Sequence, residues 1–78
     1  MLRYRLISNI NGKWIYDYSP DDSDDHGEVV YDEKNKSYEI TRLASSDRFN
    51  LYANKLLYKI KKAIENGSPL TEGIIAWY

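Results

Sequence analysis

The sequence predicts an α+β domain in which an antiparallel β-sheet of four to five strands packs one face against a single amphipathic helix. Apolar and polar residues alternate along several short segments of the first half, as in half-buried strands. Between Phe49 and Ile64 the apolar spacing changes to the 3, 4 and 7 of a helical face. With 78 residues, 42% apolar and 29% charged, the chain fits one domain, residues 1–78, with the element order ββββαβ.

The first two strands are expected to form a hairpin. Residues 2–7 and 13–18 both alternate, and the shared faces carry Leu2, Tyr4 and Leu6 in the first strand and Trp14, Tyr16 and Tyr18 in the second. Residues 9–12 between them are expected to form the turn, because Asn11-Gly12 tolerates positive φ angles. Pro20 has no N–H to donate to a ladder, so Ser19-Pro20 is expected to break the second strand.

A second hairpin is expected from residues 28–32 and 37–43, joined by the polar turn 33–36. In its second strand, Tyr38, Ile40 and Arg42 should share one face by alternation. The four strands together predict an antiparallel meander.

The helix is expected over residues 47–66, with Ser46 or Asp47 as the N-cap and Gly67 just past the end. Leu57 and Tyr58 lie off its main apolar stripe and are expected to face solvent or a partner. The apolar residues 73–78 should add a fifth strand, reached by a crossover.

Charge is unevenly distributed along the chain. Residues 17–33 hold eight acidic residues and no Lys or Arg, a local charge of −8, whereas the other residues sum to +7. This segregation could steer a basic partner to one end of the molecule. The candidate partner-binding residues are Asp21, Asp22, Asp24, Asp25 and Glu28. The alternatives are that the segment is simply hydrated or lies over the protein's own basic surface.

The acidic segment matches the calcium-binding loop of an EF-hand only in part. Asp22, Asp24, Gly27 and Glu33 match positions 1, 3, 6 and 12 of the EF-hand template. His26 is a poor ligand at position 5, however, and both flanks are expected to be strands. We therefore expect a solvated acidic loop and no metal site, with an irregular, weak cation site as the alternative.

A lysine stripe on the helix suggests an alternative role in nucleic-acid binding. Lys55, Lys59 and Lys62 lie at spacings of 4 and 3, so they could follow a row of phosphates. Such proteins usually add exposed aromatic residues on which bases stack. The aromatic residues available on the strands are Tyr4, Trp14, Tyr16, Tyr18, Tyr31 and Tyr38. Most are needed for the core, and the net charge of −1 makes nucleic acid the less favoured partner.

Catalysis has little support in the sequence. There is one histidine, His26, and no cysteine, glycine-rich phosphate loop or nucleophile motif. We expect no enzymatic activity and no cofactor. No apolar run approaches the ~20 residues of a membrane span, and the first residues do not resemble a signal peptide, so the cytoplasm is the expected location. Lys, Asn, Ile and Tyr, which have A/T-rich codons, supply 29 of the 78 residues, which favours a bacterial or phage origin.

The function that these patterns favour is protein interaction. One helix is ~10 Å wide, whereas five strands span ~20 Å, so a single helix cannot cover the sheet. The expected partner is another protein or a second copy of this chain.

Overall fold

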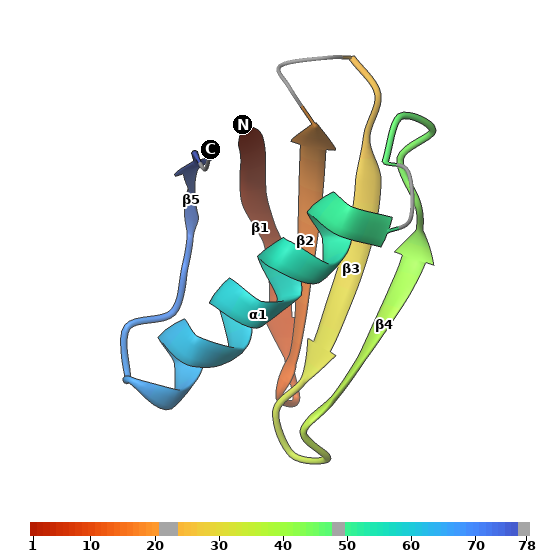
Figure 1. The fold of residues 1–78 in the computed structure, drawn as a ribbon. Coiled ribbons are helices and arrows are strands. Elements are labelled where there is room, and N and C mark those ends of the chain that lie inside the picture. The colour runs from red at the N-terminus through yellow and green to blue at the C-terminus, as the bar shows by residue number, and fades with distance from the viewer. Residues whose placement is uncertain (21–23, 48–49, 77–78) are drawn as a thin grey trace.

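The computed structural model describes residues 1–20, 24–47 and 50–76 (Figure 1). Its elements are β1 (Leu2–Ile10), β2 (Lys13–Pro20), β3 (Gly27–Asp32), β4 (Ser37–Arg42), α1 (Leu51–Glu65) and β5 (Glu72–Ile75). All strand pairs are antiparallel, in the spatial order β4-β3-β2-β1-β5. The predicted fold class, the four-stranded meander and the ββββαβ order are confirmed.

Both hairpins turn within the predicted segments, but β1 runs through Ile10, three residues beyond its expected end, so the first turn is Asn11-Gly12 instead of residues 9–12. Asn11 and Gly12 have φ angles of 56° and 81°, so the residues that tolerate this conformation form the first turn. In the second turn, the Asp32 carboxylate accepts hydrogen bonds from the backbone N–H groups of Lys34 and Asn35. Side-chain acceptors of this kind fix a turn without help from the core.

The second and third strands differ from the prediction at their shared end. β2 does not break at Ser19 but runs through Pro20, which lies opposite Leu2 and is fully buried. A proline at the last position of a strand need not interrupt the ladder, and its ring adds apolar area to the core. β3 begins at Gly27, one residue earlier than expected.

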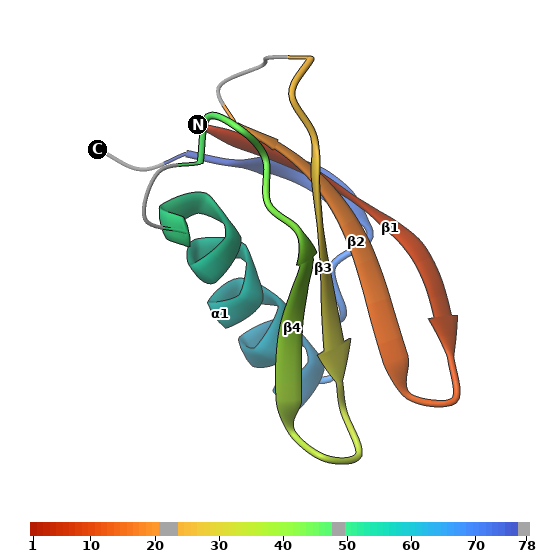
Figure 2. The same ribbon diagram turned by 90° about the vertical axis from the view of Figure 1, so that its right-hand side faces the viewer.

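Helix α1 crosses one face of the sheet and connects its two edge strands, β4 and β5 (Figures 1 and 2). It packs mainly against β3 and buries Ala53, Leu56, Leu57 and Ile60. The prediction for Leu57 is wrong: its side chain is only 4% exposed. The helix contacts β3 on that side, so the buried stripe is wider than the sequence spacing suggests. The prediction for Phe49 lies outside the described residues.

The helix begins at Leu51, four residues later than expected. Asn50 is the N-cap, with a left-handed φ of 58° and no side-chain cap bond. Asp47 lies three residues earlier, and its carboxylate accepts hydrogen bonds from the backbone N–H groups of Tyr52 and Ala53 at 2.8 and 2.9 Å. The sequence thus identifies the capping acceptor but places the first turn too early.

The helix ends as predicted. Gly67 has a φ of 75°, its N–H donates to the Ile64 carbonyl, and the N–H of Ser68 donates to the Ala63 carbonyl. This pair of bonds is a Schellman motif, with glycine at the left-handed position. The chain then leads into β5, which pairs with β1. β5 begins at residue 72, one residue earlier than expected, and ends at residue 75, and Trp77 and Tyr78 lie outside the described residues.

Tyrosines dominate the layer between the sheet and the helix. Tyr4, Tyr16, Tyr18 and Tyr31 are all buried there, as the predicted packing of the aromatic face under the helix requires. The Tyr18 ring lies against Gly27, and the Tyr4 hydroxyl end lies against Gly73. Each of these glycines is the cross-strand partner of its tyrosine, so the missing side chain makes room for an aromatic ring.

Replacing Tyr16 by phenylalanine should lower the free energy of unfolding by about 1 kcal/mol at neutral pH, because one hydrogen bond is lost. The Tyr16 hydroxyl donates to the Leu70 carbonyl at 2.7 Å. Burial, aided by Tyr4, raises the pKa of Tyr16 from 10.0 to about 12. The folded state therefore favours the neutral phenol, and this contribution is present below pH 10.0 and lost as the pH rises towards 12. Urea unfolding at several pH values should show a smaller alkaline loss of stability in Tyr16→Phe than in the unchanged protein. Tyr38→Phe, at an exposed position, should change neither the free energy of unfolding at neutral pH nor its loss at alkaline pH.

Candidate functional site

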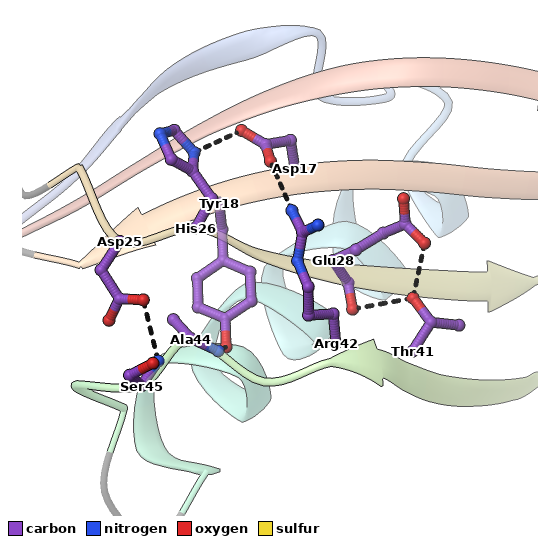
Figure 3. Close-up of polar contacts among 9 residues, drawn as sticks. All are labelled: Asp17, Tyr18, Asp25, His26, Glu28, Thr41, Arg42, Ala44 and Ser45. Atoms are coloured by element: carbon purple, nitrogen blue, oxygen red, sulfur yellow. Dashed lines mark hydrogen bonds and ion pairs between the residues drawn. The ribbon is translucent and has the colours of Figure 1, made fainter.

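The sheet face opposite α1 carries a row of charged residues that crosses all five strands. In register order, from β5 to β4, the row is Glu72, Arg5, Asp17, Glu28 and Arg42. Figure 3 shows the part of this row around Asp17. Opposite charges face each other in this row except at Asp17 and Glu28, which are neighbouring acids. At this level the face offers charged groups to water.

The position of Arg42 differs from the prediction. The pairing of β3 with β4 shifts between Glu28 and Val29, which leaves Thr41 as an extra residue and sets Arg42 opposite Glu28. Arg42 therefore leaves the face of Ile40, and its Nη2 lies 3.9 Å from Asp17 Oδ1 (Figure 3). The Thr41 hydroxyl donates to the Glu28 carboxylate at 2.6 Å. The bulge thus gathers both signs of charge at one end of the outer face.

The only histidine belongs to the same group. His26 Nδ1 lies 2.9 Å from Asp17 Oδ2, and both side chains are partly exposed. Among the described residues, no group of three or more His, Asp or Glu side chains could hold a metal ion. The Asp17 carboxylate contacts both the His26 ring and the Arg42 guanidinium, which joins β2 to the residue before β3 and to the end of β4.

Asp25 ties the acidic segment to the strand–helix connection. Its carboxylate accepts hydrogen bonds from the backbone N–H groups of Ser45 and Ser46, at 2.9 and 2.6 Å, and from the Ser46 hydroxyl at 2.7 Å. Next to it, the Tyr18 hydroxyl accepts from the Ala44 N–H and donates to Asp47 Oδ2 at 2.8 Å. Residues 44–47 are therefore fixed from two sides, which places Asp47 under the first turn of α1.

The predicted partner-binding residues now divide into three groups. Asp21 and Asp22 lie outside the described residues, and Asp24 is exposed. Asp25 and Glu28 make internal hydrogen bonds, so part of the negative charge is used within the fold. Partner binding by the acidic segment stays a prediction, but the carboxylates of Asp25 and Glu28 are not simply hydrated.

Asp25→Asn should lower the free energy of unfolding at neutral pH but not in acid. The hydrogen bonds from Ser46, then Ser45, lower the pKa of Asp25 below 3.8. A lowered folded-state pKa stabilises the fold above the unfolded value, and this contribution is lost as the pH falls below 3.8. Urea unfolding should therefore separate the two proteins most above pH 5 and make them converge at lower pH. Asp24→Asn is the matched control, and an equal effect of both variants would contradict the role of Asp25.

The lysine stripe is present, but most of the aromatic platform is not. Lys55, Lys59 and Lys62 are all exposed on α1. Of the six strand aromatics, four are buried beneath the helix, Trp14 is half-buried and donates to Glu33, and Tyr38 alone is exposed. Bases therefore have little of the stacking surface that the nucleic-acid hypothesis requires.

A groove of about 410 Å³ lies between α1 and the strands β3 and β4. It is lined by Tyr31, Tyr38, Asn54, Leu57, Tyr58 and Lys61. Tyr31 and Leu57 are buried and form its apolar floor, whereas Tyr38 and Tyr58 are 64% and 61% exposed. The volume lies within the range of about 300–1,000 Å³ typical of ligand pockets. The groove can therefore accept an apolar group between two tyrosines.

Sequence reasoning did not find this groove. Alternation places Tyr38 on one face with Ile40 and Arg42 but does not decide its exposure, and Leu57 is expected at the surface with Tyr58. A usable signal was the stripe of Asn54, Tyr58 and Lys61, which repeats at spacings of 4 and 3 on the helix face beside the apolar one. No sequence pattern could show that Tyr38, from β4, faces that stripe.

Comparisons with protein-family models, with curated proteins and with solved structures found no match to this chain. Among the described residues, no helix has the length and apolar character needed to cross a membrane.

Proposed function

We propose that this chain is a protein-interaction module that binds its partner through the groove between α1 and β4. The observation that carries the proposal is the pair Tyr38 and Tyr58, two exposed aromatic side chains above the buried floor of Tyr31 and Leu57. Tyrosine is enriched at protein interfaces, since its ring supplies contact area and its hydroxyl stays wet. A partner side chain that enters the groove would shield these rings from water.

The rest of the surface supports this choice of site. The outer face of the sheet carries the charged row from Glu72 to Arg42, and the carboxylates of Asp25 and Glu28 are hydrogen-bonded internally. Exposed apolar residues elsewhere, such as Ile7 and Ile10, are scattered, which is normal for a protein surface. The groove combines apolar area with a concave shape.

Nucleic-acid binding remains the alternative function. The exposed lysines of α1 favour it, and Tyr38 and Tyr58 could each stack on one base. The burial of the other strand tyrosines and the net charge of −1 weigh against it. A cytoplasmic location and a bacterial or phage origin stay predictions from composition, and we propose no enzymatic activity.

Affinity capture with matched baits tests the proposed function. The baits are the unchanged chain, the groove variant Tyr38→Ser/Tyr58→Ser, and the control variant Ile7→Ser/Ile10→Ser. Each variant removes two exposed apolar side chains, so solubility changes are comparable. We expect specific proteins to bind the unchanged chain and the control, and to be lost from the groove variant.

Two results would contradict the proposal. One is that no protein depends on the groove. The other is that RNase and DNase treatment removes every groove-dependent protein, which would indicate that the groove binds nucleic acid. The same baits, run in sedimentation velocity without lysate, show whether the partner is a second copy of this chain.

A further inference from the structure

From the charges around the groove we infer the class of partner: an acidic peptide segment that carries one large apolar side chain. This inference rests on the proposed function and adds the chemistry of the ligand. The apolar side chain would lie on Leu57 between Tyr38 and Tyr58, and the acidic groups would lie along the lysine side of α1.

The helix beside the groove is strongly basic. Along Leu51–Glu65 it has four lysines and one glutamate. Lys61 lines the groove, and Lys62 Nζ lies 5.7 Å from the centre of the Tyr58 ring. Both lysine side chains therefore lie on the side of the groove that Tyr58 forms. A negative group on the partner would be attracted to this side over about a Debye length, ~8–10 Å.

Negative charge also lies near the floor: Glu65 is on α1 one turn beyond Lys61, and Asp32 and Glu33 follow Tyr31 in the chain. Burial, and then Glu65, Glu33 and Asp32, raise the pKa of the Tyr31 hydroxyl above its usual 10.0. Carboxylates of a partner are therefore disfavoured near the Tyr31 hydroxyl and favoured at Lys61 and Lys62. The peptide should place its apolar residue over the floor and its acids on the helix side.

A second copy of this chain is a poorer fit to the groove. Its most acidic segment, residues 17–33, has no large apolar side chain exposed among the residues described there. Its exposed apolar residues, such as Ile7, Leu43 and Leu51, lie outside this segment. No described segment of the chain therefore combines an exposed apolar anchor with the dense acidic charge that the lysine side would attract.

The test is a titration of the ¹⁵N-labelled chain with short synthetic peptides, followed by amide chemical shifts. The probe alternates glutamate and serine around one central phenylalanine. One control peptide has serine in place of phenylalanine, and another has lysine in place of glutamate. We expect the probe to shift the amides of Asn54, Tyr58 and Lys61, and both control peptides to bind at least about tenfold more weakly.

Substitutions of three exposed charges test the charge preference of the groove. Lys61→Gln should weaken binding of the probe by about threefold, and Glu65→Gln should strengthen it by a similar factor. Arg5→Gln, which removes one positive charge from the opposite face of the sheet, is the matched control and should leave binding unchanged. Added salt should reduce the differences among these variants, since they come from screened charges. All three positions are exposed, so the fold should be retained, and the amide spectra of the free variants report this directly.

Several results would overturn the inference. These are equal binding of the serine or lysine control peptides, shifts confined to residues outside the groove, or groove shifts with an oligothymidylate but not with the probe. Groove shifts that grow with protein concentration alone would identify a second copy as the occupant. If the capture experiment finds groove-dependent proteins while the probe does not bind, the ligand class is wrong and the proposed function stands. If capture fails as well, both are wrong.

Discussion

Replacing Gly27 by alanine should lower the free energy of unfolding by about 3 kcal/mol, a large share of the stability of a small domain. A Cβ atom at this position would lie 2.2 Å from Tyr18 Cε1, 2.5 Å from Tyr18 Cζ and 2.7 Å from the Arg42 carbonyl oxygen. The ring is fully buried, and its hydroxyl is held by Ala44 and Asp47, so it has nowhere to move. Urea unfolding followed by far-UV circular dichroism measures the loss.

Gly73→Ala is the matched control for this prediction. Gly73 lies under Tyr4 as Gly27 lies under Tyr18, but its added Cβ would meet only the hydroxyl end of the ring, at 3.0 Å. The expected loss is about 1 kcal/mol. In a Tyr18→Leu background, the effect of Gly27→Ala should shrink, because two of its three short contacts come from the ring. Equal losses at Gly27 and Gly73 would contradict the argument.

The sequence was sufficient for the fold class and the order of elements along the chain, because its signals are local and agree with each other, but it did not place β5 beside β1. Period-two alternation, Asn11-Gly12 and Gly67 each determine one element or one turn, and together they leave one plausible order of elements. The errors arise where tertiary contacts override these signals. Pro20 stays in its strand because the core covers it, and the bulge at Thr41 turns Arg42 to the other face.

The site was less predictable for a physical reason. The charge of residues 17–33 is visible in the sequence, but whether a carboxylate is available to a partner depends on its hydrogen bonds. The Asp25 carboxylate accepts hydrogen bonds from the backbone N–H groups of Ser45 and Ser46, which are twenty or more positions away in the chain. The groove likewise depends on the angle at which α1 crosses β3 and β4, which brings Tyr58 opposite Tyr38. The contact of Asp25 with Ser45 and Ser46 and the position of Tyr58 opposite Tyr38 both depend on tertiary structure, so residue spacing does not reveal them.

Asp47→Ala should cost about 3–5 kcal/mol, because this carboxylate is the shared acceptor of three donors in a buried place. Asp47 is 2% exposed, and it accepts from the Tyr18 hydroxyl and from the N–H groups of Tyr52 and Ala53. Alanine leaves all three without an acceptor and removes the cap of α1. Unfolding in urea gives the size of the loss, and amide hydrogen exchange at Tyr52 and Ala53 locates it at the first turn.

Comparison with Tyr18→Phe separates the two roles of Asp47, which are to accept the hydrogen bond of the Tyr18 hydroxyl and to cap the first turn of α1. Phenylalanine removes one donor and leaves the helix cap in place, so the expected loss is about 1 kcal/mol, with little change in exchange at Tyr52. In the double variant Asp47→Ala/Tyr18→Phe, the total loss should be smaller than the sum, because the hydroxyl that Asp47→Ala leaves unpaired is gone. Asp24→Ala, an exposed acid nearby, should change the free energy of unfolding by less than about 0.5 kcal/mol. If Asp47→Ala lowers the free energy of unfolding as little as Asp24→Ala does, the hydrogen bonds to Asp47 do not hold the start of α1 in place. The position of α1 beside the groove would then depend on other contacts.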